Sequence, residues 1–172
     1  MNCILRNAKT TNDFQRIAAL AEKIWHHTYD TLIGTAQVDY MLNKFQSAEV
    51  LEKDVNENGY EYLMALQNDT LVGFCGIHSE NSETVFLSKV YVDPLYQHQG
   101  IAKKMIGHFA AKYAATGVKK IWLTVNKGNR NAILAYERLG FHKFGELVTD
   151  IGSGYVMDDD LMEIHPADFG IK

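Results

Sequence analysis

The sequence contains little proline and little cysteine: its 172 residues include only two of each. The two cysteines, Cys3 and Cys75, are isolated, which excludes a disulfide framework or a zinc knuckle. We therefore expect reduced thiols and a cytoplasmic setting. Pro94 and Pro166 are too few to mark a linker, so we expect one domain over residues 1–172.

The sequence also lacks a basic surplus and a long apolar run. Its 17 basic and 21 acidic residues give a formal net charge of −4. This charge argues against a nucleic-acid partner, because such partners are bound by neutralising phosphates. No stretch approaches the ~20 apolar residues of a membrane helix, and residues 1–10 have no apolar core of a secretory signal, so we expect neither.

Hydrophobic periodicity predicts the order strand, three helices, three-stranded meander, helix, strand, helix and two strands. That order is typical of a mixed α/β domain with a central, mainly antiparallel sheet. The expected strands are residues 2–8, 60–66, 70–78, 84–92, 119–125, 141–149 and 155–164. Thr35 and Ser47 are expected to cap the second and third helices, and Gly34 to end the first.

The predicted strand 84–92 changes phase along its length. Its apolar positions are odd-numbered at Val85 and Leu87 and even-numbered at Val90 and Val92. Because side chains alternate between the two faces of a strand, this slip predicts a β-bulge. Bulges often re-aim backbone groups at a site.

The segment Gln97-His98-Gln99-Gly100-Ile101-Ala102 follows that strand and opens a helix. The first N–H groups of a helix have no intrahelical partner, and a glycine allows close approach of a ligand, so the segment suits a pyrophosphate. Taken alone, an ordinary tight turn into a helix explains it equally well. The glycine spacing excludes a Walker loop and a dinucleotide fingerprint.

A second motif later in the chain favours a binding role for the segment 97–102. The stretches VYVDPLYQHQGIAKKMI and NRNAILAYERLGF resemble the Gcn5-related N-acetyltransferases (GNAT), whose motifs read Gln/Arg-x-x-Gly-x-Gly/Ala and Asn-x-x-Ala-x-x-x-Tyr-x-x-x-Gly-Phe. The resemblance covers residues 2–164. It implies the GNAT acyl-CoA N-acyltransferase fold with a bulged fourth strand, acetyl-CoA as co-substrate and no metal.

The resemblance also implies roles for the positions that match. Backbone groups of Val90, Tyr91 and Val92 would meet the acetyl group and the pantetheine arm. The backbone N–H groups of seven consecutive residues would hold the pyrophosphate, with Lys103 and Lys104 adding positive charge: Gln97, His98, Gln99, Gly100, Ile101, Ala102 and Lys103.

Two further positions lie in the second block. Asn129 would bind the cofactor arm. Tyr136 would protonate the leaving thiolate, because its reference pKa of ~10 exceeds the ~8.5 of a thiol. Read from periodicity alone, Tyr136 is a half-buried aromatic residue that packs on the sheet.

The general base departs from the family pattern. Many members carry a glutamate on the bulged strand near the positions that Ser88 and Lys89 occupy here, and neither is a carboxylate. The candidates are then a water chain or a side chain of the first helix: His26, His27 or Tyr29. A polar helix end explains the two histidines more simply.

Within the family, the chain is similar to bacterial spermidine/spermine (polyamine) acetyltransferases. The segment WHHTYD and the two helices after it would cover the amine, with Trp25, His26 and Tyr29 as acceptor residues. A polycation would suit an acidic protein. The resemblance implies direct attack by the amine in a ternary complex, in a monomer or homodimer.

Two other functions fit the same motifs. One is a protein or peptide acetyltransferase acting on a lysine or an N-terminus, and the other is a non-catalytic acyl-CoA-binding module. Residues 158–160 form a run of three aspartates, which we expect to be a solvated turn rather than a cation site.

Overall fold

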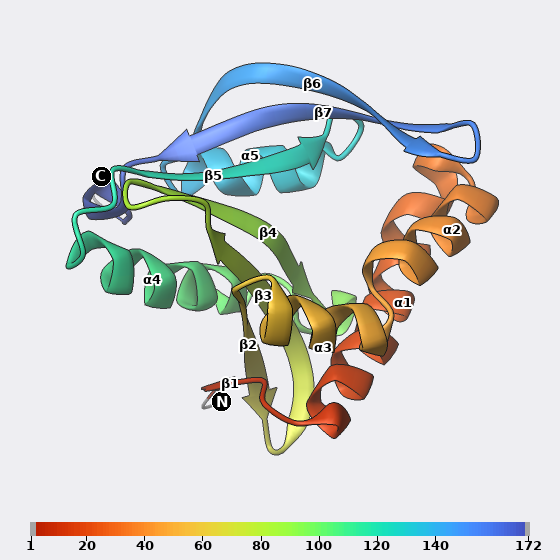
Figure 1. Cartoon of the computed structure of the whole chain (residues 1–172), viewed down its shortest axis with the longest axis horizontal. Coiled ribbons are helices and arrows are strands. Elements are labelled where there is room, and N and C mark those ends of the chain that lie inside the picture. Colours follow the sequence, from red (N-terminus) through yellow and green to blue (C-terminus); the bar gives the residue numbers. More distant parts are fainter. Residues whose placement is uncertain (1–2, 171–172) are drawn as a thin grey trace. The chain divides into compact units, whose positions relative to one another are not determined.

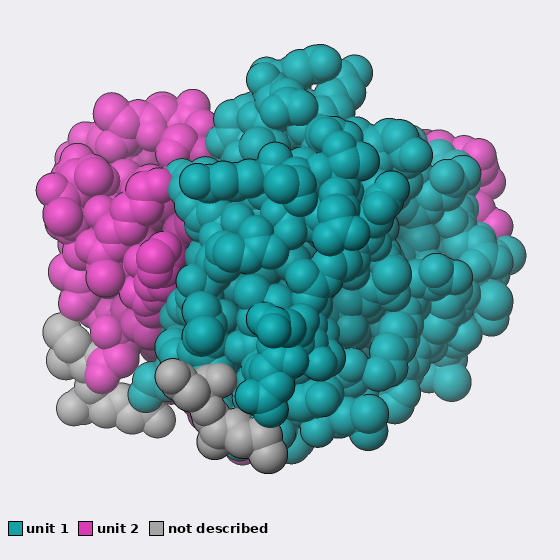
Figure 2. Space-filling view, turned by 90° about the horizontal axis from the view of Figure 1, so that it is seen from below, with its two compact units in different colours: residues 1–78, 89–106 teal, residues 79–88, 107–172 magenta. Residues whose placement is uncertain are grey.

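The computed structural model describes residues 3–170, which form two compact units (Figures 1 and 2). The first unit comprises the residues up to 78 together with 89–106, and the second comprises 79–88 and the residues from 107 onward. Two elements run through both units: a strand that crosses between Ser88 and Lys89, and a helix that crosses after Ile106.

The first unit contains three antiparallel strands in the order β1 (Ile4–Asn7), β2 (Tyr60–Gln67) and β3 (Thr70–Ser79). The expected first strand began at Asn2, which lies outside the described residues. Asn68 and Asp69 form the tight turn between β2 and β3, with φ angles of 47° and 62°, as expected of a two-residue hairpin.

Three helices lie between β1 and β2: α1 (Thr11–Ile33), α2 (Thr35–Phe45) and α3 (Ala48–Glu57). The helices contact one another, and α3 also contacts β2. Gly34 ends α1 with a φ of +86°. The expectation for Thr35 is wrong: it is the first helical residue, and Gly34 holds the cap position without a side-chain hydrogen bond. Ser47 caps α3 as expected, accepting from the Val50 N–H at 3.3 Å.

Asp13 fixes the start of α1. Its carboxylate accepts from the backbone N–H groups of Lys9 and Thr10, at 2.9 and 3.1 Å, and from the Arg6 guanidinium at 2.6 Å. These bonds hold the pKa of Asp13 well below its usual range, the Arg6 bond contributing most. The Thr10 hydroxyl accepts from the Asp13 N–H in return, which completes a capping box.

The expected strand and helix of the first motif are β4 (Thr84–Val92) and α4 (Ile101–Ala114), separated by a short 3₁₀ turn at Pro94–Tyr96. Val85, Leu87 and Lys89 are buried, so the buried phase of β4 stays odd-numbered through Lys89. Val90, Tyr91 and Val92 are all half-buried. The burial therefore does not change to the even-numbered positions, and the bulge remains a prediction.

The second unit orders its strands as β4–β5–β7–β6, with β5 (Lys120–Asn126), β6 (His142–Gly152) and β7 (Tyr155–Ile164). The β4–β5 pair is parallel from Thr84 to Phe86, and the other pairs are antiparallel. The helix α5 (Arg130–Arg138) follows β5. Buried residues Ile121, Leu123 and Val125 alternate along β5, as its sequence pattern indicates.

The aspartate run 158–160 is not the solvated turn that we expected. It lies inside β7, where Asp159 and Asp160 are buried and Asp158 forms an ion pair with Lys127 at 2.6 Å. Burial, with its two neighbouring carboxylates, raises the pKa of Asp159 to about 6. Among the helices of residues 3–170, none is long and apolar enough to cross a membrane.

Candidate functional site

The loop between β4 and α4 is fixed at several points within the first unit. Asp93 accepts from the Leu95 N–H at 3.0 Å and pairs with Lys23 at 2.7 Å. Gln67, at the end of β2, donates to Gln99 at 3.3 Å, and Gln97 donates to the Val92 carbonyl at 3.4 Å. The loop that carries the predicted anion-binding segment is therefore held by side chains of α1 and β2 and by a backbone carbonyl of β4.

The conformation of this loop fits a bound anion. Gly100 has a φ of +75°, and a Cβ built there would meet no atom within 4 Å. His98 also has a positive φ, at 61°. The first backbone bond of α4 runs from the Lys104 N–H to the Gly100 carbonyl at 2.9 Å. The N–H groups of Ile101, Ala102 and Lys103 therefore precede the helical ladder and are available to phosphate oxygens.

The two lysines at the start of α4 differ in their contacts. The Lys104 ammonium donates to the carbonyl of Cys3, so it ties α4 to the start of the chain. Both Lys103 and Lys104 are exposed, and their contribution to phosphate binding stays a prediction.

The predicted acceptor residues Trp25 and Tyr29 form an aromatic cluster with β3 and β4. The Trp25 ring lies 4.8 Å from Tyr29 and 5.9 Å from Tyr91, and Tyr91 lies 5.3 Å from Phe74, measured between ring centroids. The buried Trp25 indole N–H has no hydrogen-bond partner among the described residues. The fold thus brings Trp25 and Tyr29 on α1 beside Tyr91, one of the predicted cofactor residues.

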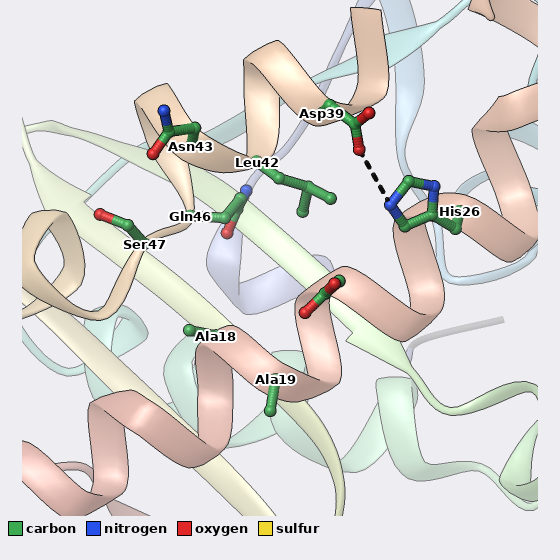
Figure 3. Close-up of a pocket in the computed structure, with 9 residues that line it drawn as sticks. Ala18, Ala19, His26, Asp39, Leu42, Asn43, Gln46 and Ser47 are labelled. Atoms are coloured by element: carbon green, nitrogen blue, oxygen red, sulfur yellow. Dashed lines mark ion pairs between the residues drawn. The ribbon is translucent and has the colours of Figure 1, made fainter. Parts of the chain in front are cut away.

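His26 lies in a separate groove of about 390 Å³, formed by α1, α2 and the turn before α3 (Figure 3). Its Nδ1 is 2.9 Å from Asp30 and its Nε2 is 3.3 Å from Asp39. The bond to Asp30, with further attraction from Asp39 and Glu22, raises the pKa of His26. Both ring nitrogens face carboxylate oxygens, so His26 would have to give up one of these contacts to accept a proton from the amine, and this arrangement argues against His26 as the base. His27 is exposed.

The sequence analysis did not predict a cluster of Lys89, Tyr62 and Asp54 inside the first unit. The Lys89 ammonium donates to the Tyr62 hydroxyl at 2.8 Å and lies 3.8 Å from a carboxylate oxygen of Asp54 on α3. The Tyr62 hydroxyl donates to the same Asp54 oxygen at 3.0 Å. The odd-numbered apolar positions of β4 were the available signal, because they place Lys89 on the buried face with Val85 and Leu87.

The two residues of the second motif belong to the second unit. The Asn129 side chain caps α5 by accepting from the Ala132 N–H at 3.2 Å. Tyr136 is half-buried on α5, and its ring meets Phe141 edge-on with centroids 5.7 Å apart. The motif thus starts at the cap of α5 and ends at the residue before β6, which explains its spacing.

Comparison with known proteins gives concordant matches. A model described as the acetyltransferase (GNAT) family matches residues 17–141. The chain is 31% identical over 153 residues to a Bacillus subtilis protein named spermine/spermidine N(1)-acetyltransferase, covering 82% of this chain and 90% of that one.

Solved structures show the same fold. A PaiA N-acetyltransferase from Thermoplasma acidophilum, in complex with coenzyme A, has a TM-score of 0.78 at 20% identity and covers 96% of this chain and 99% of its own. A spermidine N-acetyltransferase from Vibrio cholerae, in complex with CoA and spermine, has a TM-score of 0.67 at 20% identity and covers 96% of both chains. The expected fold class is confirmed.

Proposed function

Because the chain belongs to the GNAT family of acetyltransferases, it is an acetyl-CoA-dependent N-acetyltransferase, and we propose that its acceptor is a small cationic amine of the spermidine or spermine type. The observation that carries the proposal is the match to the Bacillus subtilis spermine/spermidine enzyme, which extends over 90% of that protein. We further propose that residues 1–172 act as one acetyltransferase domain in a cytoplasmic setting.

The charges of the first unit support a cationic acceptor. His26 lies one residue along α1 from Trp25 and pairs with Asp30 and Asp39. Figure 3 shows His26 facing Asp39 across the groove between α1 and α2, which Glu22 also lines. A cluster of three carboxylates raises the local concentration of cations. The amine would be received by Trp25, His26 and Tyr29, with its distal ammonium groups near these carboxylates.

We propose that the residues around Gly100 hold the cofactor. The N–H groups of residues 97–103 would bind the pyrophosphate, while the backbone of residues 90–92 and the Asn129 side chain would orient the pantetheine arm. The positive φ of Gly100 and the open space beside it support this assignment. When bound, acetyl-CoA supplies an acetyl group activated as a thioester.

The chain's own groups would then assist transfer by direct attack in a ternary complex. A backbone N–H at residue 90 or 92 would donate to the acetyl carbonyl oxygen. The Tyr136 hydroxyl would give its proton to the departing thiolate. Tyr136 matches the tyrosine of the family motif, which supports this role.

The test is acetyl transfer from acetyl-CoA to a panel of spermidine, spermine, simple monoamines and lysine-containing peptides. We expect the highest kcat/KM with spermidine or spermine, and initial-velocity lines that intersect, as a ternary complex requires. A preference for peptides would favour a protein acetyltransferase. Tight CoA binding without turnover of any amine would favour a non-catalytic module.

A further inference from the structure

The proposed reaction needs a group that removes a proton from the acceptor ammonium. The central strand carries Ser88 and Lys89 where many family members carry a glutamate. His26 has both ring nitrogens beside carboxylates, at 2.9 Å from Asp30 and 3.3 Å from Asp39. Besides the candidates of the first helix, the structure offers one more group near Trp25 and Tyr91.

Lys89 is such a group, because its amine is enclosed by polar and aromatic partners inside the first unit. Only 8% of the residue is exposed. Its nitrogen lies 2.8 Å from the Tyr62 hydroxyl and 5.2–5.5 Å from the centroids of the Tyr62 and Tyr60 rings. A buried lysine is uncommon unless it is paired, and the Lys89 nitrogen lies 3.8 Å from a carboxylate oxygen of Asp54.

The Lys89 cluster lies next to the aromatic residues of the proposed acceptor site. Tyr91 follows Lys89 by two residues on β4, so their side chains leave the same face of the strand. The Tyr91 ring contacts Trp25 with centroids 5.9 Å apart. Tyr91 also contributes to the raised pKa of Tyr62, which places both phenols in one electrostatic environment.

The cluster also has a route to solvent. Tyr62 donates to one oxygen of Asp54 at 3.0 Å, and the exposed residue Asn58 donates to the other at 3.2 Å. Lys89, Tyr62 and Asp54 therefore form a hydrogen-bonded chain from the buried face of β4 to the surface of α3.

We propose that Lys89 is the proton acceptor of the reaction: its uncharged amine takes the proton of the acceptor ammonium, and the Tyr62–Asp54 chain returns that proton to solvent. The inference rests on the proposed acetyl transfer to an amine. The transfer from the acceptor ammonium to Lys89 leaves a neutral acceptor nitrogen and a Lys89 ammonium. The nitrogen then forms its bond to the acetyl carbon as the carbon–sulfur bond breaks, and the thiolate takes the proton proposed to come from Tyr136. The second proton, which the nitrogen loses on becoming an amide, returns Tyr136 to its neutral form.

The surroundings of Lys89 allow it to be uncharged under mildly basic conditions. Burial lowers its pKa to about 8, against the opposing attraction of Asp54. The other titratable groups around it are Tyr62 and Tyr60 from β2 and Tyr91 from β4, with His78 of β3 stacked on the Tyr60 ring. Burial and Asp54 hold the pKa of Tyr62 above its usual range, so Tyr62 stays a neutral relay.

The kinetic test uses Lys89→Arg, which keeps the positive charge but cannot lose its proton. With spermidine near pH 8, we expect kcat to fall by about 100-fold, as general-base loss typically produces. The wild-type rise of kcat with pH through about 8 should also disappear. Lys53→Met is the matched control, because Lys53 is a lysine of α3 that is 64% exposed and pairs only weakly with Glu57 at 3.9 Å.

A β-trifluorinated amine separates proton acceptance from a structural role, because its three fluorines lower the ammonium pKa far enough to make it neutral at the assay pH. Lys89→Arg should acetylate it at close to the wild-type rate. Equal losses with both amines, or a Lys89→Arg variant with the wild-type rate and pH profile, would overturn the proposal.

An NMR titration tests, independently of turnover, whether the Lys89 amine loses its proton near pH 8. In protein labelled with ¹³Cε-lysine, one resonance should titrate near 8, well below the ordinary lysine value of ~10.4, and should be missing from Lys89→Arg. If every lysine titrated near the ordinary value, Lys89 could not be the proton acceptor. If the wild type acetylated no amine, the proposed function would fail, but the titration would still show whether the pKa of Lys89 is lowered.

Discussion

Substitution of Gly100 by valine should weaken coenzyme A binding far more than it weakens the fold. Gly100 has a φ of +75°, and no atom lies within 4 Å of an added Cβ. The backbone strain of a side chain in this region costs about 1–2 kcal/mol. The new side chain would also fill the space through which phosphate oxygens approach the N–H groups at the start of α4.

The expected loss of affinity follows from the hydrogen bonds at risk. A bond to a charged group contributes about 1.5–3 kcal/mol, so losing two such bonds costs about 3–6 kcal/mol. Because 1.4 kcal/mol is a factor of ten, Gly100→Val should raise the Kd for coenzyme A at least ~100-fold.

Isothermal titration of coenzyme A gives the affinity, and urea unfolding gives the stability. Gly34→Val is the control, since Gly34 has a similar φ of +86°, equally open surroundings and a place between α1 and α2, away from the proposed phosphate loop. Both variants should lose stability, and only Gly100→Val should lose affinity. Equal affinities in the two variants would refute the assignment of the pyrophosphate to this loop.

Three further substitutions test the proton donor Tyr136 and the ionisation of Asp13 and Asp159. Tyr136→Phe should lower kcat much more than it raises KM, because it removes a proton donor and keeps the ring; an unchanged kcat would remove Tyr136 from the acid role. Asp13→Asn should lower the free energy of unfolding by about 2–3 kcal/mol at pH 7. The folded-state pKa of Asp13 is depressed, so the difference in free energy of unfolding between wild type and variant should be complete above pH ~4 and shrink as the pH falls below it. A difference that did not change with pH in urea titrations would contradict the pairing with Arg6. Asp159→Asn should raise the free energy of unfolding by up to about 3 kcal/mol at pH 8 and change it little at pH 4. The reason is that the folded-state pKa of Asp159 is raised to about 6, so ionisation above that pH destabilises the fold. No gain in stability at pH 8 would show that Asp159 ionises without penalty.

Local signals in the sequence were sufficient for most elements of the fold. The expected strand 119–125 appears as β5, the expected break between residues 66 and 70 appears as the turn at Asn68 and Asp69, and Ser47 caps α3 as predicted. The prediction that Thr35 caps α2 was wrong because the chain turns at Gly34, whose positive φ lets α2 begin without a side-chain cap. Capping residues show only a capacity to cap, and the backbone decides which residue fills the position.

The polar groups inside the protein were harder to predict, because they depend on pairing between distant segments. The aspartates 158–160 look solvated in isolation, but antiparallel pairing sets Asp160 opposite Val125 and Asp159 opposite Asn126. Lys89 likewise meets Asp54 and Tyr62, which are 35 and 27 residues away in the sequence. No local pattern encodes such a meeting.

The candidate site was predicted in part. The motif around Gly100 was readable because it combines a glycine with a helix start, and the structure gives Gly100 the expected open conformation. The position of His26 between Asp30 and Asp39 depends on the packing of α2 against α1, which helical periodicity alone does not fix.

The most direct test of the central claim is the rate of acetyl transfer from acetyl-CoA to spermidine by the purified protein, measured by release of free CoA thiol and by the mass of the amine product. The account predicts a product one acetyl group heavier than spermidine, formed with a higher kcat/KM than for any monoamine or peptide in the panel. No acetylated polyamine, with efficient acetylation of a peptide amine instead, would contradict it.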